Sequence, residues 1–265
     1  MSHADFLLFG ALMLLNWYLE SLKWKFLVRG IEDISQTQAI KATLAGMSFG
    51  LLTPNRMGNF IGKIIYLQPG NRLEGTLFAL YGNFSQMLTT FLFGSFCFLF
   101  TFENYYSQTN VFMAVLPFAF SLGLAFLFLF PQKLNLNFAE RVLSQELFGA
   151  FNRLIHFKGK EVVLGYSILR HLVFTIQYLI VLFYSPVFEF WSSFMAIQMI
   201  FFLTTIIPGL VFGKMMVRGP VAIFVLGILG YSTSFAINAI LFIWLINIAL
   251  PSLVGSFLFM IKKRG

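Results

Sequence analysis

The sequence predicts an all-α, polytopic integral membrane protein, and three observations support this prediction. Hydrophobic residues make up 58% of the 265-residue chain and charged residues only 11%, whereas a soluble domain carries roughly 25% charged residues. The apolar residues gather in successive stretches, several of them long enough to cross about 30 Å of hydrocarbon. The net charge of +8 is best explained by basic cytoplasmic loops. It does not indicate a nucleic-acid partner, because the basic residues are not clustered in a soluble domain.

Seven apolar stretches are expected to cross the membrane, with a re-entrant pair of short helices between the first two. The loops 102–110 and 185–190 contain no Lys or Arg and are expected outside, whereas the basic C-terminus is expected inside. This pattern predicts an external N-terminus, a cytoplasmic C-terminus and a location in the bacterial cytoplasmic membrane. The predicted crossings are about 4–28, 75–101, 111–130, 162–184, 190–207, a stretch that follows a break at 207–220, and 233–261.

The whole chain, 1–265, is expected to form one transmembrane domain. Its longest polar stretch, 131–160, contains five basic residues and is therefore placed in the cytoplasm. Apolar residues recur at helical spacing between Phe138 and Ile155, which predicts an amphipathic helix lying at the membrane interface.

The sequence Thr-Pro-Asn-Arg-Met-Gly-Asn at 53–59 interrupts a helix-patterned region, about 36–67. Pro54 removes a backbone donor and disfavours helix in the residue before it, and Gly58 permits a sharp bend. Because each arm is short for a spanning helix, we expect a re-entrant hairpin that enters from the cytoplasmic side. Irregular backbone at membrane depth must be buried in protein or line a wet cavity, and a charge there, Arg56, marks a functional site. The alternative is a cytoplasmic turn with Arg56 among the headgroups.

A second interruption lies at 207–220 and contains Pro208, Gly209, Gly213, Lys214 and Arg218. Paired Pro/Gly interruptions in two halves of a membrane protein point to a transporter-type binding site and to inverted-repeat character. Broken helices expose backbone N–H groups that attract anions, and arginine adds a planar donor fork suited to phosphate. The alternative is that Gly and Pro are simply common in membrane helices.

Several polar residues fall inside the predicted crossings. Glu20 shares a helix face with Asn16 and Lys23 and is expected to balance the cations at the two breaks. Alternatively, it pairs with Lys23 or Lys25 at the interface. Four further side chains are expected to line a shared polar interior: Asn83, Gln86, Arg170 and Gln177. Hydrogen bonding between neighbouring helices is the other explanation for such groups.

The motif at 53–59 resembles the T-P-[GN]-R-x-G-E motif of the lysylphosphatidylglycerol synthase transmembrane region, also called the flippase-like domain family. Residues 16–25 resemble the helix that precedes this motif, and residues 208–219 resemble the family's later Pro…Gly-x-Arg segment. The resemblance covers nearly the whole chain and implies a polytopic membrane protein, here a stand-alone member without the aminoacyl-transferase domain. In members fused to that domain, the membrane part is assigned lipid flipping. The family's motif acids are replaced here by Asn59 and Gly219. If those acids take part in headgroup or proton chemistry, this chain lacks that function or uses Glu20 instead.

The leading expectation is a lipid translocase or transporter-like protein that holds an anionic, phosphate-bearing headgroup between two broken helices. The residues expected to bind it are Arg56, Arg218, Lys214, Glu20, Asn59, Asn83, Gln86 and Arg170, and the expected helix breaks are Pro54, Gly58, Pro208, Gly209 and Gly213. No cofactor, metal or independent catalysis is expected, because His3, His156 and His171 lack metal-ligand spacing and the crossings contain no carboxylate pair. The alternatives are a membrane subunit of an aminoacyl- or glycosyl-transferase that modifies lipid headgroups, and a non-transporting partner of an envelope-synthesis enzyme.

Cysteine accessibility tests the predicted topology. In a variant whose Cys97 is replaced by Ala, a cysteine at position 104 is expected to react with a membrane-impermeant maleimide added outside, because its loop lacks basic residues. A cysteine at position 158 is expected to react only after permeabilisation. Labelling of both positions from the same side would contradict the predicted topology.

Overall fold

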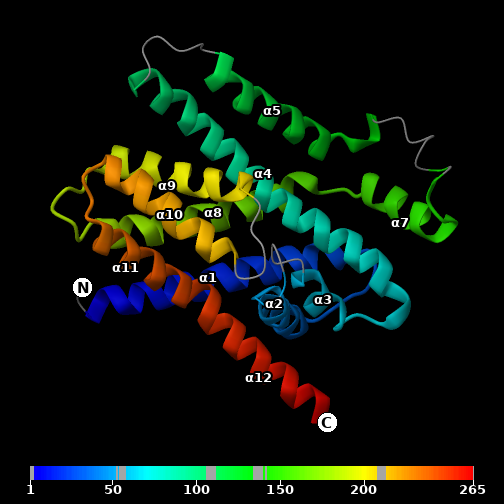
Figure 1. Ribbon diagram of the computed structural model, residues 1–265. Coiled ribbons are helices and arrows are strands. Elements are labelled where there is room, and N and C mark those ends of the chain that lie inside the picture. The colour runs from blue at the N-terminus through cyan, green and yellow to red at the C-terminus, as the bar shows by residue number, and fades with distance from the viewer. Residues whose placement is uncertain are drawn as a thin grey trace.

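The computed structural model describes residues 3–51, 53, 58–105, 112–133, 140, 142–207 and 213–264. All regular structure within these ranges is helical, which confirms the predicted all-α class (Figure 1). The N-terminus lies at the side of the molecule where α8 connects to α9 and α10 connects to α11, whereas the C-terminus lies at the other side.

Four helical segments are long and apolar enough to cross a membrane: His3–Val28, Pro69–Phe100, Lys160–Leu182 and Thr233–Met260. They belong to α1 (His3–Val28), η2 (Pro69–Asn71) with α4 (Arg72–Tyr105), α8 (Lys160–Leu182), and the continuous run of α11 (Thr233–Trp244), η4 (Leu245–Ala249) and α12 (Leu250–Arg264). Shorter apolar helices form at the other predicted crossings: α5 (Phe112–Leu129), α9 (Phe190–Ile206) and α10 (Gly213–Ile228). The apolar stretches therefore become helices, while the number of crossings stays a prediction.

The first interrupted region forms two helices, α2 (Gln36–Leu51) and α3 (Asn59–Ile64). Thr53 fixes the connection between them, because its hydroxyl accepts a hydrogen bond from the Gly58 amide at 2.6 Å and donates one to the Phe49 carbonyl at 3.2 Å. Pro54 and Arg56 lie outside the described residues. The re-entrant position of the pair in a membrane stays a prediction.

Glycines allow α3 to lie directly against α2. A Cβ atom at Gly62 would clash with the backbone of Ala45 and Gly46, and one at Gly58 would clash with the carbonyl of Phe49. Gly58 has a φ of −62°, which any residue adopts, so this position requires glycine for close approach and not for the bend that the sequence suggests. Small residues of this kind are common where membrane helices meet.

The last helix holds α2 from another side. A Cβ atom at Gly255 of α12 would clash with the backbone of Leu44. The Ser48 hydroxyl donates to the Ser252 carbonyl at 2.6 Å, and the Ser252 hydroxyl donates to the Met47 carbonyl at 3.2 Å. Close packing and reciprocal hydrogen bonds therefore fix the interrupted region between α3 and α12.

The predicted amphipathic helix, 138–155, is confirmed over α7 (Gln145–Ile155), which follows η3 (Pro131–Lys133). Residues 138, 139 and 141 lie outside the described residues. Ser144 caps its start by accepting a hydrogen bond from the Leu147 amide at 3.3 Å. Arg153, near its end, forms an ion pair with Glu74 of α4 at 2.8 Å. This contact docks α7 on α4, and the position of α7 at a membrane interface stays a prediction.

The largest apolar core lies among α8, α9, α10 and α11, around buried side chains such as Tyr178, Ile200 and Leu226. Polar side chains from α1, α4 and α8 are buried beside this core. Burial of polar groups is unfavourable unless they form hydrogen bonds or ion pairs, and many of these groups form such contacts with one another.

Gly62→Ala is expected to lower the free energy of unfolding by roughly 1–3 kcal/mol, the usual effect of overpacking, because the added methyl group would clash with α2. Gly165→Ala in α8 is the matched control, since a Cβ atom there meets nothing within 4 Å and alanine favours helix. Thermal unfolding of both variants in one detergent measures the difference. Equal melting temperatures would contradict the close α2–α3 contact.

Candidate functional site

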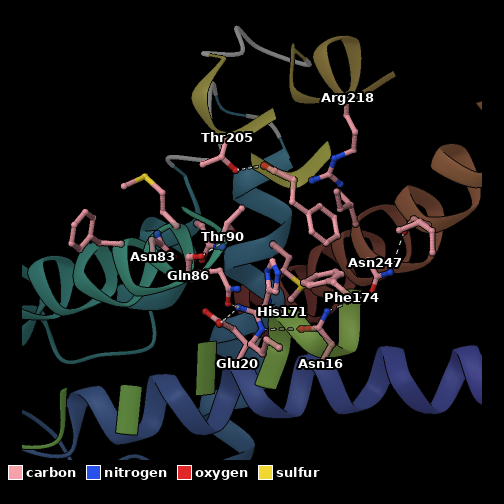
Figure 2. A pocket seen from close by; sticks show the side chains of 18 of the residues that line it. Asn16, Glu20, Asn83, Gln86, Thr90, His171, Phe174, Thr205, Arg218 and Asn247 are labelled. Atoms are coloured by element: carbon pink, nitrogen blue, oxygen red, sulfur yellow. Dashed lines mark hydrogen bonds and ion pairs between the residues drawn. The ribbon is translucent and has the colours of Figure 1, made fainter. Parts of the chain in front are cut away.

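Side chains from helices far apart in the sequence line one cavity of about 510 Å³. Figure 2 shows Arg218 of α10 reaching toward it from the side opposite Glu20 and Asn16 of α1. The polar lining residues are Asn16, Glu20, Asn59, Asn83, Gln86, Thr90, Arg170, His171, Thr205, Arg218 and Asn247. Charged and amide groups that converge on a cavity inside a membrane protein make it the candidate binding site.

Glu20 lies at the centre of a buried cluster of charges. Its Oε1 atom lies 2.5 Å from Lys63 Nζ and its Oε2 atom 3.0 Å from Lys23 Nζ, and Oε2 also accepts a hydrogen bond from Arg170 Nη1. The exposed fractions of these four residues are 3%, 2%, 1% and 9%. The cluster joins α1, α3 and α8, and it holds the short helix α3 through Lys63.

Neutral groups complete the hydrogen bonding of the cluster. Lys23 Nζ donates to the Gly82 carbonyl at 3.1 Å. Arg170 donates through Nε to Asn16 Oδ1 at 2.8 Å and through Nη1 to Gln86 Oε1 at 3.1 Å. In the part of the chain that the structure describes, Nη2 of Arg170 has no hydrogen-bonding partner. Arg170 is therefore fixed in position and keeps one nitrogen free at the cavity wall.

Positive charge exceeds negative charge around the cavity. Three cations contact a single carboxylate in the cluster, and Glu20 is the one acid among the described lining residues. Arg218 is a second cation beside Arg170 in the cavity lining. Within the described residues its buried Nε has no hydrogen-bonding partner, and its Cζ lies 6.0 Å from the centre of the Phe201 ring. Like charges repel strongly where the dielectric constant is low, so the cavity favours an anion.

A π-helical turn, η4, places Asn247 at the cavity. Asn247 Nδ2 donates to Gln177 Oε1 at 2.9 Å, and Asn247 Oδ1 accepts from Asn16 Nδ2 at 3.5 Å. Asn16 in turn accepts the hydrogen bond from Arg170 Nε. Single π turns are rare and often occur at functional sites. Here the turn supplies the last link of an amide chain that orients Arg170.

His171 lies in the cavity wall with a side-chain partner behind it. Its Nε2 lies 2.6 Å from Gln198 Oε1, and its ring stacks on Phe93 with 4.9 Å between ring centres. Within the described ranges, no three His, Cys, Asp or Glu side chains are grouped so that they could hold a metal ion.

The structure brings together six of the eight residues predicted to bind a headgroup, and all six line the cavity: Glu20, Asn59, Asn83, Gln86, Arg170 and Arg218. Gln177, predicted for the same polar interior, is buried and bonded to Asn247. The role of these residues in binding stays a prediction.

The other predicted positions fall at or beyond the limits of the described chain. Gly213 begins α10 and Lys214 follows it. Arg56, Pro54, Pro208 and Gly209 lie outside the described residues.

The ion pairs of Glu20 in the structure agree only in part with the predicted ones. Of its three partners, Lys23 was one of the alternatives, but Lys63 and Arg170 were not. Lys63 is only 2% exposed, because α3 lies directly against α2. Asn247 was missed as well, although the sequence shows it as one of two amides, with Asn238, in the predicted crossing 233–261.

A family model described as the lysylphosphatidylglycerol synthase TM region matches residues 1–255. Every residue that lines the cavity falls within this match. No curated protein and no solved structure matches the chain.

Glu20→Gln is expected to lower the free energy of unfolding by about 3–5 kcal/mol, because it leaves three buried cations without a counter-charge. Glu74→Gln is the matched control. It breaks an ion pair whose arginine side chain is 62% exposed, so it should change the free energy of unfolding by no more than about 1 kcal/mol. Equally small losses of thermal stability in both variants would count against a charge cluster that the fold requires.

Proposed function

Because the chain belongs to the family of the lysylphosphatidylglycerol synthase transmembrane region, a membrane domain linked to lipid modification, we propose that it is a lipid translocase. A phosphate-bearing, anionic headgroup occupies the polar cavity. The family match confirms the resemblance noted for the motif at 53–59, and the proposal about substrate and activity is supported by the chemistry of the cavity.

The observation that supports the proposal most is the buried Nε of Arg218. Within the described residues this atom has no hydrogen-bonding partner, and a buried donor without a partner is unfavourable by about 1–3 kcal/mol or more. A phosphate oxygen would satisfy it, since arginine presents several N–H donors in a plane that matches phosphate geometry. Arg170, with its free Nη2 at the same cavity, supplies a second donor.

The charge balance supports the same ligand class. Among the described residues that line the cavity, the charged groups are the two guanidinium groups of Arg170 and Arg218 and the single carboxylate of Glu20. A headgroup with a net negative charge reduces this excess, whereas a cationic headgroup adds to it. Arg56 and Lys214 stay further predicted ligands of the same phosphate.

The apolar part of the cavity suits a lipid better than a free anion. Phe84, Met87, Phe174 and Ile248 line it beside the polar groups. Ile206 also lines it and is 49% exposed, so the cavity reaches the surface near the end of α9. A hydrocarbon chain can leave there while the headgroup stays among the polar groups.

The second candidate function is a membrane subunit of an enzyme that modifies lipid headgroups. The name of the matching family, which includes a synthase, favours this alternative. The chain alone in lipid vesicles separates the two functions. A translocase speeds the exchange of a labelled anionic phospholipid between leaflets, whereas a subunit binds the lipid without moving it.

Arg218→Lys is expected to weaken binding of an anionic phospholipid by about tenfold or more, because lysine cannot reproduce two parallel hydrogen bonds to one phosphate. Native mass spectrometry of the purified protein with added lipid measures binding. A dithionite assay on vesicles with labelled lipid measures translocation, which should fall together with binding.

Arg153→Lys is the matched control for this experiment. Arg153 of α7 pairs with Glu74 of α4, neither residue lines the cavity, and the Arg153 side chain is 62% exposed. The same substitution there should leave lipid binding and translocation unchanged. If Arg218→Lys retained full binding and full translocation, the headgroup site would be refuted.

A further inference from the structure

We infer that the cavity binds a proton together with the lipid phosphate, and that Nδ1 of His171 holds this proton. The inference rests on the proposed function, since it names a second ion that is taken up with the headgroup. Three features lead to it: a histidine in the cavity wall, a hydrogen-bond chain that occupies only one of its ring nitrogens, and an excess of positive charge that a bound anion reduces.

His171 of α8 lies among the groups that are proposed to bind the headgroup. It lines the cavity, its ring stacks on Phe93 of α4, and it meets Phe201 of α9 in a T-shaped contact with 5.4 Å between the ring centres. The Arg218 guanidinium lies over the same Phe201 ring. Figure 2 shows His171 between Arg218 on one side and Glu20 on the other. A charge on the imidazole would therefore act on the bound headgroup.

The hydrogen bonds behind the ring fix its neutral tautomer. The Thr175 hydroxyl has a single hydrogen, which it donates to the His171 carbonyl at 3.0 Å, so it accepts from Gln198 Nε2 at 3.1 Å. This arrangement turns Gln198 Oε1 toward His171 Nε2, which lies 2.6 Å away. Because an amide oxygen can only accept, Nε2 carries the ring hydrogen and Nδ1 carries the lone pair.

The lone pair of Nδ1 is available for a proton. Nδ1 has no hydrogen-bonding partner among the described residues. When a hydronium ion transfers a proton to this lone pair, a new N–H bond forms, water is released, and the hydrogen bond from Nε2 to Gln198 stays in place. Histidine is also the side chain that ordinarily titrates between roughly pH 5 and pH 8. Proton uptake at His171 therefore breaks no hydrogen bond of the chain.

The charges of the empty cavity oppose this proton. The charged residues that line the cavity with His171 are Glu20 of α1, Arg170 of α8 and Arg218 of α10. The described lining residues from α2, α3, α4, α9, α11 and η4 are neutral. The Glu20 carboxylate already pairs with Arg170, Lys23 and Lys63. An imidazolium in the empty cavity would thus face two guanidinium groups and an acid whose charge is already compensated, which is unfavourable.

A bound phosphodiester reverses this balance. It brings a negative charge to the arginines beside His171, and a nearby anion favours the charged form of a histidine. Coupling of this kind is reciprocal, so a proton on His171 strengthens binding of the phosphate by the same factor. The proton and the headgroup therefore enter and leave the cavity together, and the pair adds no net charge to the protein.

Binding of phosphatidylglycerol to the full-length protein in detergent, measured at pH 8 and at pH 6, tests this inference. The phosphodiester of this lipid stays ionised over the whole range, so a change in affinity reports a group of the protein. The dissociation constant should be about tenfold lower at pH 6, because binding takes up a proton. Equal dissociation constants at the two pH values would overturn the inference.

Titration calorimetry of the native protein counts the protons without any substitution. The same binding reaction is measured in two buffers that differ in their heat of ionisation, and the difference gives the number of protons taken up. The largest uptake between pH 6 and pH 8 should approach one proton per lipid. No uptake at any pH in this range would refute the coupled binding of proton and phosphate.

His171→Gln identifies the residue that holds the proton. Glutamine keeps an N–H donor for Gln198 but takes up no proton in this range. The variant should bind phosphatidylglycerol at pH 8 like the native protein, which shows that it is folded, and should gain no affinity at pH 6. His156→Gln is the matched control, because His156 is exposed at the end of α7 and does not line the cavity. This control should keep the native pH dependence, and an unchanged pH dependence in His171→Gln would exclude His171.

The two levels of the proposal fail in different ways. If binding of phosphatidylglycerol depends on Arg218 but takes up no proton, the phosphate site stands and the proton site is refuted. If binding does not depend on Arg218, the proposed function fails and the proton site with it.

Discussion

The arrangement of the interior depends on one carboxylate, that of Glu20, which contacts Lys23, Lys63 and Arg170. These residues come from α1, α3 and α8, so the contact joins the first helix to the short arm of the interrupted region and to a central crossing. A buried charge is tolerated only with partners, and here each cation requires the same acid. The close α2–α3 contact at Gly62 is what brings Lys63 within 2.5 Å of it. Packing of small residues and pairing of charges therefore support each other.

The same constraint leaves the cavity short of negative charge. Glu20 cannot neutralise three cations, and Arg218 on the far wall has no acid within the described residues. A fold that keeps this excess in a water-poor interior is best stabilised when an anion is bound. Stability and binding of the proposed headgroup are thus expected to be coupled.

Much of the fold and part of the site could be predicted from the sequence, for physical reasons. Apolar length predicts helices, and charges within apolar stretches predict functional residues because they are unfavourable in lipid. Glu20, Arg170 and Arg218 were found in this way. The ion pairs of Glu20 could not be predicted, because the packing of the helices determines which cations lie near this acid. The burial of Lys63 could not be predicted, because its depth depends on how α3 lies on α2. Asn247 was missed because its amide gives no indication of the π turn that places it at the cavity.

The most direct test of this account is an experimental map of the protein in lipid nanodiscs that contain an anionic phospholipid. The account predicts density for a headgroup phosphate within hydrogen-bonding distance of both Arg218 and Arg170, with Glu20 still bound to Lys23 and Lys63. It would be contradicted by a cavity without a headgroup in which Arg218 pairs with an acid of the chain. A map in which Arg218 extends to headgroups at the membrane surface would contradict it equally.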